Sequence, residues 1–199
     1  MMLIEQTGVP SSAMPVAEFK DHLRLGTGFA DDGAQDALTE SYLRSALAAI
    51  ERRIGKSLIS RDFLLTLASW RNSLVQALPT APVNAVGSVT VFDRDGTGVV
   101  IDPARYRLER DSQRPRLVAI GGQLPVIPTG GSVEIGLTAG FGPQWSDLPP
   151  DLAQAVFLLA AGYYEKRHET DPQPAAMPFG VMALIERWRT VRTLGGGAL

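Results

Sequence analysis

The order of the hydrophobic patterns along the 199-residue chain constrains the fold more than any other feature. Apolar residues recur at helical spacing near both ends, whereas the middle alternates apolar and polar residues between glycines and prolines. A helix with one apolar face must bury that face against another element. Neither terminal pair of helical segments can cover its own apolar surface, so we expect all four to pack together, with the strand-rich middle projecting as an insertion.

The N-terminal third of the chain predicts two helices. The first begins at Pro15, a residue well suited to a first helical position, and ends near Leu25. The second is predicted over 32–54, followed by Gly55 in the position that commonly ends a helix. The apolar stripes of these helices consist of Val16, Phe19 and Leu23 in the first, and of Leu43, Leu47, Ile50 and Ile54 in the second.

Two more helices are predicted after Pro149 and Pro150. One spans 151–169, with acidic Asp151 in its first turn and basic residues in its last turn, as the helix dipole favours. The other begins at Pro178. The apolar stripes are Leu152, Val156, Leu159 and Tyr163 in the first of these helices, and Val181, Leu184, Ile185 and Trp188 in the second.

The middle of the chain follows the period of two that is typical of strands. Short runs of this kind, separated by prolines, predict a small antiparallel sandwich or an open barrel. The runs lie at 63–67, 89–91, 99–101, 106–108, 117–120 and 133–138. The predicted fold class is therefore α+β: a discontinuous four-helix core over 14–56 and 147–193, an inserted antiparallel β-rich domain over 57–146, and a flexible tail over 194–199.

The composition excludes several classes of protein. Hydrophobic residues make up 45% and charged residues 20% of the chain, as in folded domains rather than disordered ones. A formal net charge of -2 provides no general attraction to nucleic acid. The absence of cysteine excludes disulfides and thiolate metal sites. The most apolar run, 152–164, is too short to span a bilayer, and the first ten residues lack the features of a secretory signal, so we expect a soluble protein.

Two short motifs have structural rather than chemical interpretations. The segment Asp93–Gly96 begins like a calcium loop, but Ala104 stands where the bidentate glutamate of an EF-hand belongs, so a tight turn is favoured. The glycines in GLTAGFG, at 136–142, follow a strand without opening a phosphate-binding helix, and they indicate a sharply bent backbone.

The C-terminal third contains the remaining candidate functional residues. Glu165 and His168 could form an acid–base pair, but no nucleophile lies near them in sequence and a charged helix end is usually solvated. The last helix places Trp188 among arginines, and both residue types are enriched at the energetic centres of protein interfaces. We therefore weigh a docking helix equally against a core tryptophan flanked by solvated arginines, with DNA binding far behind both. The arginines are Arg187, Arg189 and Arg192.

Several segments, in order along most of the chain, match one protein family. They are VAEFKDHLR at 16–24 with Asp31 and Asp32, ALAAIERRIG at 46–55, Leu78–Pro79 with Pro82–Val83, VTVFDRDG at 89–96, TAGFG at 138–142, LPPDLAQAV at 148–156, YEKR at 164–167, PFGV at 178–181, and Trp188–Arg189. In these segments the chain resembles the head–tail connector, or adaptor, proteins of long-tailed phages. The resemblance is closest to the branch shared with phage-derived gene transfer agents.

This resemblance implies a structural protein with a helical core and a β-rich insertion. It implies a ring of about twelve copies that docks beneath the portal of a virion or phage-like particle, binds a tail-side stopper or completion protein, and lets DNA pass through its lumen without sequence-specific binding. Assembly would take place in the bacterial cytoplasm, with no membrane involved. The family brings no catalytic residue, cofactor or metal, and its C-terminal helix engages the portal, which assigns docking to Arg187, Trp188, Arg189 and Arg192.

Two other functions stay open from the residues alone. One is a hydrolase that uses Glu165 and His168. The other is a monomeric ligand- or carbohydrate-binding module, in which the β-rich domain binds and the helices support it. A ring, formed alone or with a portal, separates the adaptor from both.

Overall fold

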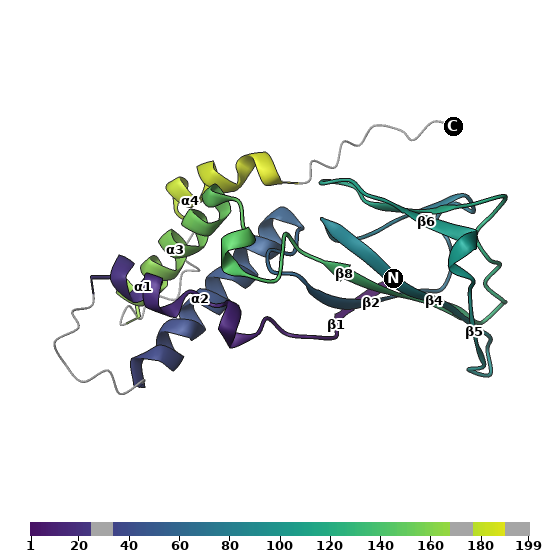
Figure 1. The fold of residues 1–199 in the computed structure, drawn as a ribbon, viewed down its shortest axis with the longest axis horizontal. Coiled ribbons are helices and arrows are strands. Elements are labelled where there is room, and N and C mark those ends of the chain that lie inside the picture. The colour runs from purple at the N-terminus through teal and green to yellow at the C-terminus, as the bar shows by residue number, and fades with distance from the viewer. Residues whose placement is uncertain (25–33, 168–176, 190–199) are drawn as a thin grey trace.

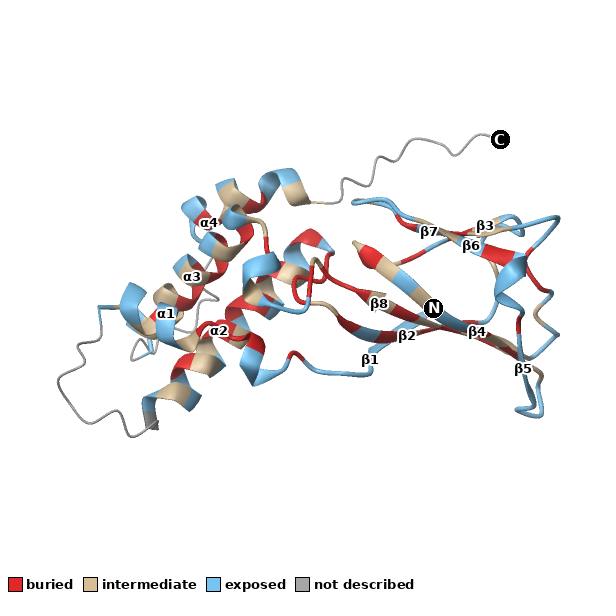
Figure 2. Cartoon of the chain, viewed as in Figure 1, coloured by how far each residue is buried: buried red, intermediate tan, exposed pale blue. Residues whose placement is uncertain are grey.

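The computed structural model describes residues 1–24, 34–167 and 177–189. The helices gather at one end of an elongated molecule and the strands at the other (Figure 1). Each end has its own cluster of buried apolar side chains (Figure 2). The fold is α+β, as predicted: four helices, with two antiparallel sheets formed mostly by the segment between the second and the third.

All four helices contribute to one hydrophobic cluster, which confirms the prediction that they pack together. The helices are α1 (Val16–His22), α2 (Ala34–Ile54), α3 (Pro150–Glu165) and α4 (Phe179–Ile185), and a short 3₁₀ turn, Glu186–Trp188, follows α4. Helix α1 is shorter than predicted, because Arg24 has a φ of 54°, in the left-handed region that a right-handed helix cannot contain. Leu25 lies outside the described residues.

The predicted stripes account for this packing. Leu43, Ile50 and Ile54 of α2 are fully buried or nearly so, and each contributes about 2 kcal/mol by leaving water. On α3, Leu152 is fully buried, whereas Tyr163 is half-buried. The ring of Tyr42 meets that of Tyr164 edge to face at 5.9 Å, which places the C-terminal end of α3 beside the first half of α2.

The larger sheet has five antiparallel strands in the order β1-β2-β8-β4-β5. Their bounds are Met2–Glu5 for β1, Arg61–Leu67 for β2, Ser132–Ala139 for β8, Val83–Phe92 for β4 and Gly98–Val100 for β5. The smaller sheet has three strands in the order β3-β7-β6, namely Val75–Ala77, Arg116–Ala119 and Tyr106–Glu109. Side chains from both sheets form one buried cluster, so the predicted sandwich is confirmed.

The sequence patterns missed strands β1 and β3. Strand β1 is four residues of mainly apolar sequence without alternation, and all of them are exposed, so no burial pattern marks it. It pairs with β2 in a register that places Leu3 opposite Leu65. Strand β3 has only three residues, below the length at which a period of two is visible.

The segment between β1 and α1 is held against α2. The Arg44 guanidinium donates a 2.7 Å hydrogen bond to the carbonyl of Val9 and forms an ion pair with Glu40. The Ser11 hydroxyl donates to the Glu40 carboxylate at 2.8 Å. The hydrogen bonds from Ser11 and Arg44 lower the pKa of Glu40. These contacts fix the path of the chain from β1 to α1.

Candidate docking site

The C-terminal end of the described chain is anchored on α3. Pro178 precedes α4 in an extended conformation, and Val181 and Ile185 are buried against the helical cluster. The 3₁₀ turn that follows brings Trp188 back to the first turn of α3, where its indole nitrogen donates a 2.7 Å hydrogen bond to a carboxylate oxygen of Asp151. The Trp188 ring also meets Phe141 edge to face at 5.4 Å. Trp188 is therefore a half-buried anchor rather than a free side chain.

The neighbouring arginines are partly exposed and paired with carboxylates of this chain. The Arg187 side chain is 69% exposed, although its Nε lies 2.9 Å from the carboxylate of Asp151. Its guanidinium lies over the Trp188 ring, 4.8 Å from the centroid. The Arg189 side chain is 41% exposed and pairs with Glu186 of the preceding turn at 3.0 Å. Arg192, also predicted to dock, lies outside the described residues.

The structure thus brings Arg187, Trp188 and Arg189 together beside the N-terminus of α3. Both guanidinium groups are paired with carboxylates of this chain and remain partly exposed beside a fixed indole, so their remaining N–H groups can donate to a carboxylate-rich partner surface. The sequence pattern gave no sign of the role of Asp151, because Asp151 and Trp188 are separated by 37 positions.

A second polar cluster joins the helices to the sheets. The Arg61 guanidinium donates to both carboxylate oxygens of Glu51, at 2.9 and 2.7 Å, and its Nε lies 2.9 Å from Glu5. The backbone N–H of Leu58 also donates to Glu51, at 2.6 Å. Burial lowers the pKa of Arg61, but Glu51 and Glu5 together outweigh this and hold it above its usual value. The cluster fixes β1 and β2 relative to the end of α2.

Lys56 lies beside this junction and is buried. Its amine donates to the carbonyl of Ser112, in the loop between β6 and β7. Burial lowers the pKa of Lys56, and the nearby carboxylate of Asp111 opposes the shift. The pKa of Asp111 is itself lowered, because the backbone N–H groups of Arg114 and Gln113 donate to it. The loop and the end of α2 are therefore tied by one buried cation.

The structure describes only one member of the candidate acid–base pair at the end of α3. Glu165 is exposed, and His168 lies outside the described residues. Among the residues that the structure describes, no group of three or more histidines and carboxylates could hold a metal ion. Asp93 forms the tight turn that was predicted, since its carboxylate accepts from the backbone N–H of Asp95 and of Thr97 at 2.9 and 2.8 Å.

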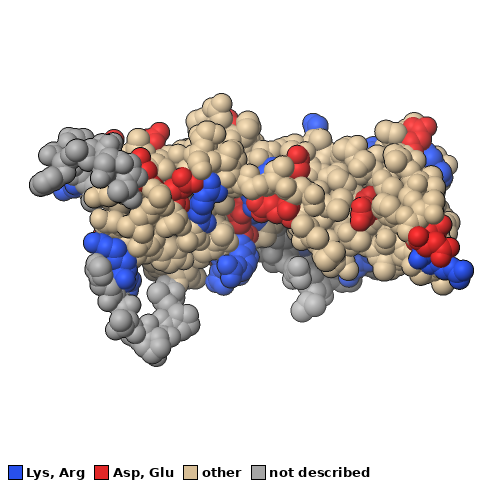
Figure 3. All heavy atoms as spheres, turned by 90° about the horizontal axis from the view of Figure 1, so that it is seen from below, with Lys and Arg blue, Asp and Glu red and all other residues tan. Residues whose placement is uncertain are grey.

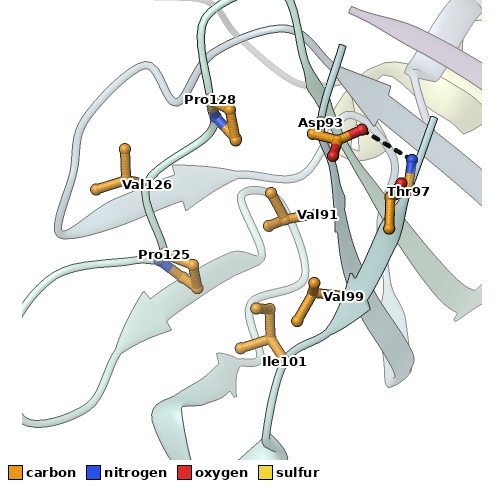
Figure 4. Close-up of a pocket in the computed structure, with 8 residues that line it drawn as sticks. All are labelled: Val91, Asp93, Thr97, Val99, Ile101, Pro125, Val126 and Pro128. Carbon is orange, nitrogen blue, oxygen red and sulfur yellow. Dashed lines mark hydrogen bonds between the residues drawn. The ribbon is translucent and has the colours of Figure 1, made fainter. Parts of the chain in front are cut away.

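A shallow pocket of about 270 Å³ lies at the far end of the sandwich, between β5 and the segment 125–128 (Figure 4). Its lining is apolar apart from Asp93 and Thr97, and Asp93 is already engaged in the turn. The pocket therefore lacks the converging polar groups by which a catalytic or carbohydrate site orients a substrate.

The surface carries charges of both signs. On the face shown in Figure 3, small groups of basic and acidic side chains alternate with uncharged surface, and no broad field of one sign is visible. Every helix in the described ranges is too short or too polar to cross a bilayer.

Comparison with solved structures finds close relatives. A chain in the neck of an empty GTA particle, computed with C6 symmetry, is 62% identical over 98% of this chain and 99% of that chain, with a TM-score of 0.89. A chain in the virion of the native gene transfer agent (GTA) particle is 62% identical with the same coverage and a TM-score of 0.86. A chain in the neck of the native GTA particle, computed with C12 symmetry, is 57% identical over 98% of this chain and 99% of that chain, with a TM-score of 0.85. Comparisons with models of protein families and with curated proteins gave no match.

Proposed function

Because this chain belongs to the family of gene transfer agent neck proteins, we propose that it is the adaptor of such a neck, a ring-forming protein that joins the portal to the tail. The observation that supports this most strongly is the 62% identity, over 98% of the chain, with a protein of a GTA particle neck. The protein is a structural component of that neck and not an enzyme.

In this proposal about twelve copies form a closed ring. Necks that contain the relatives were computed with C6 and C12 symmetry, and a cyclic ring requires two different, complementary faces on each subunit. The helical core over 14–56 and 147–193 and the β-rich domain over 57–146 act as two domains of each subunit, and the predicted tail, 194–199, lies outside the described residues.

The C-terminal group, Arg187, Trp188, Arg189 and Arg192, docks on the portal. The hydrogen bond from Trp188 to Asp151 holds the 3₁₀ turn on α3. The turn therefore holds the partly exposed Arg187 and Arg189 in fixed positions. Preorganised arginines lose less conformational entropy on binding than arginines on a free tail. A tail-side stopper or completion protein binds the opposite end of the ring.

DNA passes through the lumen of the ring without sequence-specific contacts. A net charge of -2 and a surface of mixed sign suit this role, because many phosphate contacts would slow the passage of the duplex. A protein that gripped DNA would present a concentrated basic surface instead.

The test of docking is the double variant Arg187→Ala/Arg189→Ala. We expect it to retain its fold, measured by circular dichroism and thermal unfolding, and to lose binding to the co-expressed portal in pull-down. The matched control is Arg94→Ala/Arg105→Ala, which removes two exposed arginines from the far end of the β-rich domain and leaves portal binding unchanged.

Electron microscopy of the same samples tests the ring. Portal complexes of the unaltered chain should show a ring of adaptor subunits beneath the portal. If the double variant binds the portal as well as the control does, the docking assignment is wrong. If the unaltered chain forms no ring with the portal, the adaptor proposal itself fails.

A further inference from the structure

The five-stranded sheet ends in two open edges, β1 and β5, and both expose apolar side chains. In β5, Val99 is 61% and Val100 is 69% exposed. In β1, Met2 is 53%, Leu3 is 36% and Ile4 is 42% exposed. Proteins usually protect such edges with charged residues, prolines or bulges, because an open edge pairs readily with another strand. Neither β5 nor the first three residues of β1 contain a charge or a proline.

The pocket at the far end of the sandwich lies directly beside the β5 edge (Figure 4). Val99 and Ile101 line one side of it, and the segment from Pro125 to Pro128 lines the other. An added strand is recognised by main-chain hydrogen bonds at the edge and by pockets that take its alternate side chains. The open β5 edge and the adjacent pocket together provide both features.

We propose that in the ring β1 of one copy docks along β5 of the next copy, so that the five-stranded sheets join into one continuous belt. The inference rests on the proposed function, because it requires a cyclic ring of this chain. The occupant is a second copy because the sheet offers both halves of the contact. A cyclic ring joins unlike faces of adjacent copies, and β1 and β5 are the opposite edges of one sheet.

The register of the sheet places matching side chains on each face of this junction. Residues opposite one another in antiparallel strands point to the same face. The pairs Leu3–Leu65, Leu65–Ile135, Ile135–Val89, Val133–Val91 and Val91–Val99 follow one face across the sheet. The pairs Met2–Thr66, Thr66–Glu134, Glu134–Thr90 and Thr90–Val100 follow the other. Leu3 of one copy therefore meets Val99 and the pocket of the next copy, and Met2 and Ile4 meet Val100.

Strand direction and size are compatible with closure. Every neighbouring pair in the sheet is antiparallel, so β1 and β5 run in the same direction and the junction between copies is parallel. Five strands per copy at a spacing of about 4.8 Å give a width of about 24 Å. A belt of about twelve copies would measure about 290 Å around, with a radius of about 46 Å, which leaves room for a central channel.

Cysteine cross-linking tests the contact without interference from native cysteines of this chain, because the chain contains none. The full-length double variant Leu3→Cys/Val99→Cys, co-expressed with the portal, is treated with a short bismaleimide reagent. We expect a ladder of covalent oligomers, whereas the single variants Leu3→Cys and Val99→Cys give no ladder. The comparison pair Ser45→Cys/Leu158→Cys probes the exposed faces of α2 and α3 as the alternative contact.

A second variant tests the edge without cross-linking. Val99→Lys/Val100→Lys should lower the fraction of chain found in rings about tenfold or more, by electron microscopy, while the monomer keeps its thermal unfolding temperature. Leu74→Lys, which changes an equally apolar side chain that is 54% exposed outside this edge, should leave the rings intact.

Rings that survive Val99→Lys/Val100→Lys, or rings in which only the Ser45→Cys/Leu158→Cys pair cross-links, would overturn the edge contact while the adaptor proposal stands. If the unaltered chain forms no ring with the portal, both proposals fall together.

Discussion

The indole nitrogen of Trp188 donates a 2.7 Å hydrogen bond to the carboxylate of Asp151, which lies in the first turn of α3. The same carboxylate oxygen lies 2.9 Å from Nε of Arg187. One acidic side chain therefore holds both the aromatic anchor and the adjacent cation. A residue far from the C-terminus in sequence thus determines how the candidate docking residues are presented.

Replacing this carboxylate should release the turn. We expect Asp151→Ala to lower the free energy of unfolding by about 1–2 kcal/mol, because the half-buried indole N–H loses its acceptor and the first turn of α3 loses a favourable negative charge. Portal binding should fall as well, because the turn that carries Arg187 and Arg189 is no longer held on α3.

Chemical denaturation and portal pull-down are the two measurements. Asp95→Ala removes an exposed carboxylate from the turn between β4 and β5. This control should change neither the free energy of unfolding nor portal binding. Unaltered portal binding by a folded Asp151→Ala protein would show that presentation by Asp151 does not matter for docking.

The elements that could be predicted from sequence are those whose burial is periodic. Leu43, Leu47, Ile50 and Ile54 recur at helical spacing because one face of α2 is buried from Thr39 to Ile54. Strands β2 and β8 are predictable for the corresponding reason, since every second residue faces the sandwich core. The joint packing of all four helices also followed from the sequence, because unpaired apolar stripes have to be covered.

What the sequence could not reveal depends on contacts between distant residues. Strand β1 has no buried face of its own, and only its pairing with β2 defines it. In the sequence, Arg61 is indistinguishable from a surface arginine, because its partners Glu51 and Glu5 are brought to it only by the fold. The sequence singled out Trp188 as a docking candidate, but its partner Asp151 lies on another helix, so its role as an anchor had no local signal.

Removing only one charge of the buried Glu51–Arg61 pair should lower the free energy of unfolding strongly. Glu51→Gln leaves the Arg61 guanidinium with Glu5 as its remaining carboxylate, so we expect a loss of about 3 kcal/mol in the free energy of unfolding. The double variant Glu51→Leu/Arg61→Leu removes both charges and should lose less than the single variant. Urea denaturation measures all three proteins, and a double variant that is less stable than Glu51→Gln would contradict the argument from desolvation.

Gly140 lies where β8 leaves the sheet toward the helices, and it has no room for a side chain. Its φ is 139°, and a Cβ atom there would lie 2.4 Å from the backbone nitrogen and Cα of Ser60. We expect Gly140→Ala to destabilise the protein by about 3 kcal/mol, because the backbone at Ser60, just before β2, has to move, which adds to the conformational strain. Gly96→Ala is the matched control: its φ is 85° but nothing lies within 4 Å, so strain alone should cost about 1 kcal/mol. Equal losses in thermal unfolding would show that the close approach to Ser60 is unimportant.

Lys56 makes stability depend on pH in the alkaline range. Burial holds the pKa of Lys56 below its ordinary value of 10.5, so between the lowered folded-state pKa and 10.5 the unfolded chain binds more protons than the folded chain. The contribution of Lys56 to the free energy of unfolding therefore rises with pH across that window and is constant below it. In Lys56→Met this contribution is absent, whereas the titrations of the other groups remain.

The difference in the free energy of unfolding between the unaltered chain and Lys56→Met should accordingly shift in favour of the unaltered chain as the pH increases toward 10.5. Urea denaturation of both proteins at a series of pH values from neutral upward gives this difference directly. A difference that is flat throughout, or that moves in favour of Lys56→Met, would mean that the amine beside Ser112 is not desolvated in solution. The Asp111 carboxylate opposes the lowering of the Lys56 pKa. In Asp111→Asn, the pH at which the contribution of Lys56 to the free energy of unfolding begins to rise should therefore be lower.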